Sequence, residues 1–134
     1  QQAVKQAPTL PKSAAEWATS DALIELGGRA VEGLLIAQSF DRDDSSARYR
    51  AFRGSFLERF GREPGYSAIN SHDAATVVIE AVERRERGEA LKDAILRMRG
   101  FDGLQQRMEF DRFGDTRRAV YFTEIRDGRF VLIR

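Results

Sequence analysis

The side chains of this 134-residue sequence that are best suited to chemistry or binding lie at two places, Glu16-Trp17 and His72-Asp73. His72 is the single histidine, and a histidine beside an aspartate is half of a catalytic dyad. Successive residues of a helix point about 100° apart, so these two side chains do not naturally hydrogen-bond to each other. No Gly-x-Ser-x-Gly elbow or other nucleophile context accompanies them. The sequence therefore predicts that His72 is structural first, a polar group of a binding site second and a catalytic base last, and that the chain is not an enzyme.

The pair Glu16-Trp17 lies in the small-residue stretch "AAEWATS", just before a predicted helix, and Trp17 is the only tryptophan. A carboxylate beside an aromatic plane can hold an ammonium group by ion pairing and cation–π contact. Alternatively, Trp17 fills a gap in the core and Glu16 is merely exposed. Taken alone, the residues favour this second interpretation.

Other patterns give no site for a metal, phosphate or cofactor. The segment "DRFGD", residues 111–115, lacks the third acidic ligand and the spaced glutamate of a calcium loop, so a β-turn is expected. Gly27 and Gly28 end a helix instead of opening one, unlike a phosphate-binding loop. The absence of cysteine excludes disulfides, thiol catalysis and cysteine-ligated metals.

The composition predicts a globular chain with a hydrophobic core. Hydrophobic residues make up 42% of it, and the charged residues nearly balance at a net charge of +1, which argues against a nucleic-acid partner. No apolar run approaches the roughly 20 residues of a membrane span, and the first 13 residues carry no signal-peptide core.

The order of predicted elements is typical of an α/β protein. A continuous apolar run predicts a strand over 31–40 that is buried on both faces. An aromatic stripe of core residues is expected on the following helix, and Asp127-Gly128 predicts a β-hairpin. The remaining predictions are helices over 20–28, 72–87 and 89–99, and short strands over 66–71, 107–110, 118–125 and 129–134; the aromatic stripe is Tyr49, Phe52, Phe56 and Phe60.

Three segments in this order resemble the type I periplasmic solute-binding proteins, specifically the branched-chain amino-acid-binding group. They are "LIELGGRAVEGLLIAQSF", "RYRAFRGSFLERFGREPGYSAINSHDAATVVIEAV" and "FDGLQQRMEFDRFGDTRRAVYFTEIRDGRFVLI", which together cover nearly the whole chain. Two positions depart from the family pattern. His72 stands where the family often has the tyrosine of Tyr-Asp-Ala, and Gln106 stands at the second glycine of the C-terminal element.

The resemblance implies part of a two-lobed fold, with parallel Rossmann-like sheet segments, helices and an antiparallel β tail. It places residues 1–40 in the C-terminal lobe, 41–115 in the N-terminal lobe and 116–134 back in the C-terminal lobe. It implies a ligand site formed by Glu16, Trp17, Tyr66 and His72 in a cleft between lobes. Glu16 would face a ligand ammonium, Trp17 and Tyr66 would form apolar walls, and His72 would be a neutral polar group.

The function that the resemblance implies is delivery of a small ligand, an amino acid or related carboxylate, to the permease of an ABC transporter, in the periplasm or outside the cell. A ligand-sensing domain of a signalling receptor is the alternative. If Glu16 does not face the ligand, Arg42 or another arginine could bind a carboxylate. An incomplete parallel sheet exposes strand edges, so a homodimer through these edges is also expected.

Overall fold

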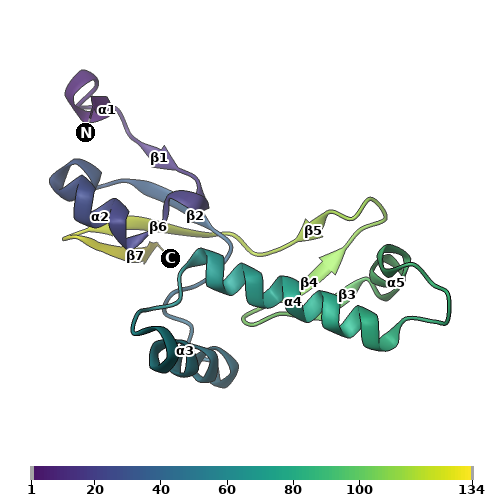
Figure 1. Cartoon of the computed structure of the whole chain (residues 1–134). Helices are drawn as coiled ribbons and strands as arrows, with labels where there is room; N and C mark the ends of the chain where they lie inside the picture. Colours follow the sequence, from purple (N-terminus) through teal and green to yellow (C-terminus); the bar gives the residue numbers. More distant parts are fainter. Residues whose placement is uncertain (1, 134) are drawn as a thin grey trace. The chain divides into compact units, whose positions relative to one another are not determined.

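The computed structural model describes residues 2–133, and the chain forms two compact units (Figure 1). The first unit comprises Gln1–Asp43 and Val120–Arg134, and the second comprises Asp44–Ala119. Each unit contains helices and a β-sheet, which confirms the predicted α/β class. The assignment of lobes to residues 1–40, 41–115 and 116–134 stays a prediction.

The first unit is built around a four-stranded sheet with the order β1-β2-β6-β7. Strands β1 and β2 are parallel, whereas β2, β6 and β7 pair antiparallel. The strands β1 and β7 are the sheet edges, and the homodimer through them stays a prediction. The elements of this unit are α1 (Gln2–Gln6), β1 (Ser13–Ala14), η1 (Glu16–Ala18, a 3-10 helix), α2 (Asp21–Gly27), η2 (Gly28–Val31, a 3-10 helix), β2 (Leu35–Gln38), β6 (Tyr121–Arg126) and β7 (Arg129–Ile133).

Strand β2 is buried on one face, so the prediction of a strand buried on both faces is wrong. Ile36 is fully buried and packs with Val31 of η2 and Ile125 of β6 beneath α2. Leu35 points to the other face and is 37% exposed. The exposed Phe122 and Ile133 share its face through the strand register.

The hairpin predicted at Asp127-Gly128 is confirmed and joins β6 to β7. Both residues have positive φ, 51° and 67°, as a type I′ hairpin turn requires. The carboxylate of Glu32 accepts hydrogen bonds from both backbone N–H groups, at 2.9 and 2.8 Å. The end of the hairpin is therefore tied to the segment that precedes β2.

The second unit packs helices on a three-stranded antiparallel sheet of order β3-β4-β5 (Figure 1). Its core contains Val77 and Ala81 of α4, Ala94 of α5, Phe101 of β3 and Met108 of β4. None of the helices over residues 2–133 has the length and apolar character to cross a membrane. The elements are α3 (Ala47–Phe60), α4 (Tyr66–Arg84), α5 (Leu91–Met98), β3 (Gly100–Asp102), β4 (Arg107–Phe110) and β5 (Thr116–Arg117).

Helix α4 begins at Tyr66, so the predicted strand over 66–71 and the helix start at His72 are wrong. Gly65 is the N-cap residue and follows Pro64, which favours a helix start directly after the pair. The buried residues of α4 recur every four positions, which is the spacing of one helix face. They are Ile69, Asp73, Val77 and Ala81.

The aromatic stripe on α3 is only partly a core stripe. Tyr49 is buried, Phe52 and Phe56 are half-buried, and Phe60 is 54% exposed. The rings of Phe52, Phe56 and Phe60 contact one another in sequence, with centroids 5.8 and 4.6 Å apart. Burial therefore falls along α3 from its first turn to its last.

Candidate functional site

The carboxylate of Glu16 is held in place by Ser39 of the same unit. One carboxylate oxygen of Glu16, Oε1, accepts hydrogen bonds from the backbone N–H and the hydroxyl of Ser39, both at 2.6 Å. Ser39 directly follows β2, and Glu16 opens the short helix η1. The other oxygen, Oε2, accepts no hydrogen bond from the described residues, so the carboxylate is oriented and keeps one acceptor atom for another donor.

Trp17, the neighbour of Glu16, is 77% exposed. The interpretation that it fills a core gap is therefore wrong for the first unit considered by itself. Its indole is a large exposed apolar surface on the residue that follows Glu16. A carboxylate and an aromatic ring that meet the same ligand can hold an ammonium group by ion pairing and cation–π contact.

Arg42 lies in the same unit, with its guanidinium carbon 4.3 Å from the ring centre of Phe130 and 5.3 Å from that of Phe40. One of its nitrogens is 3.4 Å from the backbone oxygen of Thr19, three residues after Glu16. A cation stacked between aromatic rings is held by its π contacts and by packing. Arg42 is thus fixed close to the segment that carries the Glu16-Trp17 pair.

Tyr66 and His72 both belong to α4 in the second unit, where Tyr66 is its first residue. Residues six apart on a helix point about 120° away from each other, so α4 does not place these two side chains on one face. His72 is about 39% exposed, its ring contacts the edge of Phe52, and its Nδ1 lies 3.7 Å from Asp73 Oδ1. Its predicted position at a helix opening is wrong, and the four predicted site residues fall into two pairs, one in each unit.

Asp73 has contacts that the sequence did not predict. It was expected in a first helical turn, but it lies within α4 and is buried. Its Oδ1 accepts a hydrogen bond from the Leu104 backbone N–H at 2.8 Å, and its Oδ2 pairs with Arg118 at 3.3 Å. Arg118 and Asp73 are 45 positions apart, a pairing that local spacing cannot reveal.

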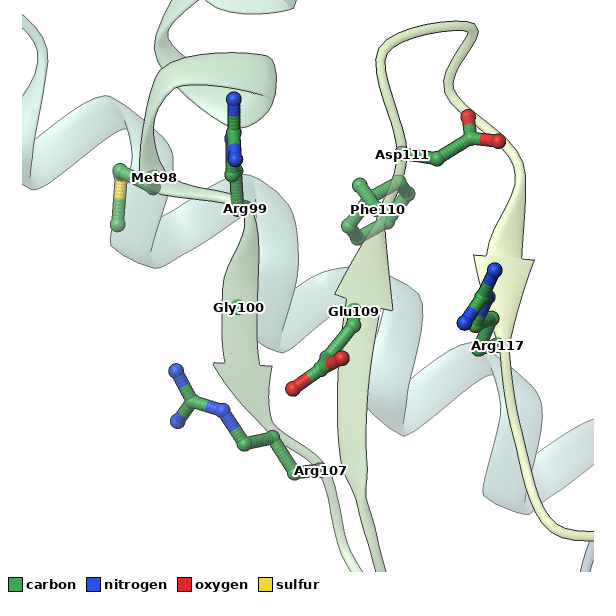
Figure 2. A pocket seen from close by; sticks show the side chains of 8 residues that line it. All are labelled: Met98, Arg99, Gly100, Arg107, Glu109, Phe110, Asp111 and Arg117. Carbon is green, nitrogen blue, oxygen red and sulfur yellow. The ribbon is translucent and has the colours of Figure 1, made fainter.

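A separate pocket of about 320 Å³ lies in the second unit beside β3, β4 and β5 (Figure 2). Arg99, Arg107 and Arg117 line it together with Glu109 and Asp111. These side chains are exposed, Arg107 pairs with Asp102 at 3.0 Å, and the Asp111 carboxylate accepts the N–H groups of its own turn. The pocket is a solvated charged surface and contains none of the four predicted site residues.

No cluster of three or more histidine, cysteine or carboxylate side chains in residues 2–133 is arranged to hold a metal ion. The pair Glu16-Trp17 in the first unit and the pair Tyr66-His72 in the second each offer hydrogen bonding or charge together with an aromatic ring. Such groups can recognise a ligand without any change of covalent bonds.

Comparisons with known proteins identify the family of the chain. The profile of the family described as "Periplasmic binding protein" matches residues 4–129. A leucine-binding protein from Thermotoga maritima is 28% identical, with a TM-score of 0.84, and the match covers 99% of this chain and 39% of that one. A substrate-binding protein of an ABC transporter from Desulfitobacterium hafniense, solved with leucine, is 24% identical over 98% of this chain and 38% of its own, with a TM-score of 0.79.

A benzoate complex of a solute-binding protein from Rhodopseudomonas palustris shares the fold at 18% identity and a TM-score of 0.73, covering 92% of this chain and 35% of that one. This chain thus spans well under half the length of the solved structures that it matches. A search among curated proteins found no match. Because the family profile covers nearly all of the sequence, the chain belongs to the periplasmic binding protein family. The solved structures that it resembles are type I, branched-chain amino-acid-binding proteins, which confirms the resemblance seen in the sequence.

Proposed function

We propose that this chain forms part of the solute-binding component of an ABC transporter and contributes to the binding of a small amino acid or related carboxylate. The protein would act in the periplasm or outside the cell and would pass its ligand to a membrane permease. Recognition alone is required, with no covalent step. The family membership and the structures solved with leucine and benzoate support this role.

The observation that carries the proposal is the oriented carboxylate of Glu16 beside the exposed Trp17. Ser39 fixes one oxygen of Glu16, so little side-chain entropy is lost when the other oxygen meets a ligand ammonium. The indole of Trp17 adds an apolar and cation-attracting surface next to it. Tyr66 and His72 stay candidate ligand contacts, with an aromatic ring and a neutral polar group respectively.

Thermal unfolding in the presence of ligand pairs tests the proposal. Leucine is compared with its 2-oxo acid, which has the same side chain and carboxylate but lacks the ammonium group. Benzoate is the aromatic acid in the panel. A ligand that binds the folded chain raises the melting temperature in proportion to the logarithm of its concentration over its dissociation constant. We expect leucine to raise the melting temperature more than the 2-oxo acid does.

The variant Glu16→Gln keeps the shape of the side chain and removes its charge. It should abolish the advantage of leucine over the oxo acid, whereas Glu25→Gln, at an exposed position of α2, should leave that advantage intact. A larger shift with the oxo acid or benzoate would move the proposal to a carboxylate ligand held by an arginine. If no member of the panel shifts the melting temperature, the proposed contribution of this chain to binding is wrong.

A further inference from the structure

The chain passes between the two units at two points, after Asp43 and after Ala119. A binding protein that closes around its ligand does so by backbone rotation at such connections, while the units move as bodies. The backbone bonds that can rotate are those that no hydrogen bond or strand pairing holds to either unit. At the second connection, the structure gives their limits in detail.

The second connection is fastened to the second unit through Arg118. Its Nη1 donates to Asn70 Oδ1 at 3.0 Å and to Asp73 Oδ2 at 3.3 Å, and both acceptors lie on α4. Its Nη2 lies 2.8 Å from the sulfur of Met108 on β4. The Arg118 side chain is 20% exposed, so these contacts are largely shielded from water. Arg118 therefore cannot turn away without breaking a largely buried ion pair.

Ala119 is fastened next, through its backbone. Its N–H donates to the side-chain oxygen Oε1 of Gln106 at 2.7 Å. On the other side, Tyr121 begins β6 and pairs with Gln38 in the sheet of the first unit. Val120 alone stands between the last residue fastened to one unit and the first strand residue of the other, and its side chain is 60% exposed.

Gln106 ends a short loop, residues 103–106, that is itself fixed at several points of the second unit. Gly103 N–H donates to the Gln106 backbone oxygen at 3.0 Å, and the Gly103 oxygen accepts from Arg48 Nη1 at 2.6 Å. Leu104 N–H donates to Asp73 at 2.8 Å. The loop thus holds Arg48, shortly after the first connection, and Ala119, at the second.

We infer that Ala119 and Val120 form the pivot of the second connection. Gln106 is a positioning residue that confines rotation to them, because its hydrogen bond with the Ala119 N–H holds the peptide group between Arg118 and Ala119. Without that bond the peptide group between Arg118 and Ala119 can turn as well, and the pivot widens to include the backbone of Arg118. The position of the pivot does not depend on the proposed function. Its role in closure around a ligand does rest on the proposed function.

The test uses two substitutions of nearly equal size at position 106. Gln106→Glu keeps an oxygen that can accept the Ala119 N–H, whereas Gln106→Leu has none. The chain contains no cysteine, so Glu25→Cys on α2 and Glu83→Cys on α4 give one spin-label site in each unit without further changes. Pulsed electron paramagnetic resonance then gives the distribution of distances between the labels, in the absence of ligand.

We expect a broader distance distribution for Gln106→Leu than for the unsubstituted chain and Gln106→Glu. The Ala119 amide should also exchange with solvent about tenfold faster in Gln106→Leu, while amides of the β6–β7 hairpin, which report on folding, stay unchanged. Equal distributions in all three proteins would overturn the inference, as would a broad distribution in Gln106→Glu. Because no ligand is added, this outcome is separate from the thermal test of Glu16.

Discussion

One oxygen of the Glu16 carboxylate accepts two hydrogen bonds from Ser39, each 2.6 Å long. This relationship joins the start of η1 to the residue that follows β2, across 23 positions of sequence. It fixes a carboxylate whose neighbour, Trp17, is exposed. The direction of Glu16 is therefore decided before any ligand arrives.

Removing the hydroxyl of Ser39 should weaken this arrangement without abolishing it. In Ser39→Ala, Glu16 keeps the backbone N–H and loses one donor, so the free energy of unfolding should fall by about 1 kcal/mol. Urea denaturation measures the change. Ser45→Ala, at an exposed serine before α3, serves as the control and should change the stability much less. Equal changes in the two variants would contradict a specific role for the Ser39 hydroxyl.

Asp73 should be among the most sensitive polar positions of the second unit. Its side chain is 4% exposed, and Asp73→Ala leaves both Arg118 and the Leu104 N–H without their shared acceptor. Loss of one partner from a buried ion pair costs about 3 kcal/mol. Thermal or urea unfolding measures this loss.

The control for Asp73→Ala is Asp102→Ala, which breaks an ion pair with Arg107 on the exposed face of the sheet. Both side chains of that pair are more than half exposed, 63% and 57%, so the cost should stay below about 1 kcal/mol. A similar cost for the two variants would mean that the Asp73 contacts add nothing to stability beyond those of a surface pair.

Local sequence patterns predicted the structure correctly where the residue types favour one backbone conformation. Asp127-Gly128 predicted the hairpin because a type I′ turn needs positive φ at both positions, which Asp and Gly tolerate, and both have it. The amphipathic pattern of α5 likewise predicted a helix that buries Ala94. The start of α4 was missed because Tyr66–Asn70 contains residues common in strands, while Pro64-Gly65 and the four-residue spacing of buried positions determine a helix.

Contacts between distant positions were out of reach of the sequence. Nothing in the local pattern pairs Asp73 with Arg118, or Glu16 with Ser39, because only the folded chain brings them together. The apolar run that contains Leu35 suggested burial on both faces, but within the first unit α2 and η2 cover only the face of Ile36. Hydrophobicity shows that a residue can be buried, and only the packing shows whether it is.

Two glycines of the second unit should respond differently to alanine. A Cβ at Gly103 would lie 2.6 Å from the Gln106 backbone oxygen and 3.0 Å from Asp73 Oδ2, and neither group can move without losing its bonds. Overpacking of this kind costs about 1–3 kcal/mol. A Cβ at Gly100 would meet the end of the Arg107 side chain, which is exposed and flexible. Urea denaturation should therefore show a larger loss for Gly103→Ala than for Gly100→Ala, and the reverse order would contradict the loop geometry.

Arg99 should be a position where glycine stabilises the chain. It follows α5 with φ 59° and ψ −34°, a backbone conformation that strains a residue with a side chain. Relief of this strain by Arg99→Gly should raise the free energy of unfolding by about 1 kcal/mol. Arg117→Gly, at the end of strand β5, is the matched control and should lower stability, because its φ is not positive and glycine loses more backbone entropy on folding than arginine does. A loss of stability in Arg99→Gly would show that its side chain contributes more than the strain costs.

Glu89 should make stability depend on pH in the acidic range. Its carboxylate accepts hydrogen bonds from Arg97 Nε and Nη2, at 2.8 and 2.9 Å, and from the Glu86 backbone N–H at 2.8 Å. The bonds from Arg97, followed by the Glu86 backbone bond, lower the pKa of Glu89 from 4.5 to about 2. A pKa depressed in the folded state means that the unfolded chain binds the proton more readily, so the contribution to stability is present above pH 4.5 and is lost as the pH falls toward about 2.

Carbon-13 NMR of the glutamate carboxyl groups should therefore show that the Glu89 carboxyl titrates with a midpoint at pH about 2. In Glu89→Gln the unfolding free energy should also fall less steeply between pH 4.5 and 2 than in the unsubstituted chain, because no carboxylate is left there to take up the proton. Glu83→Gln, at an exposed position of α4, is the control for the loss of one charge and should keep the steeper dependence. If Glu89→Gln and the unsubstituted chain share one pH profile, Arg97 does not hold the carboxylate in solution as it does in the structure.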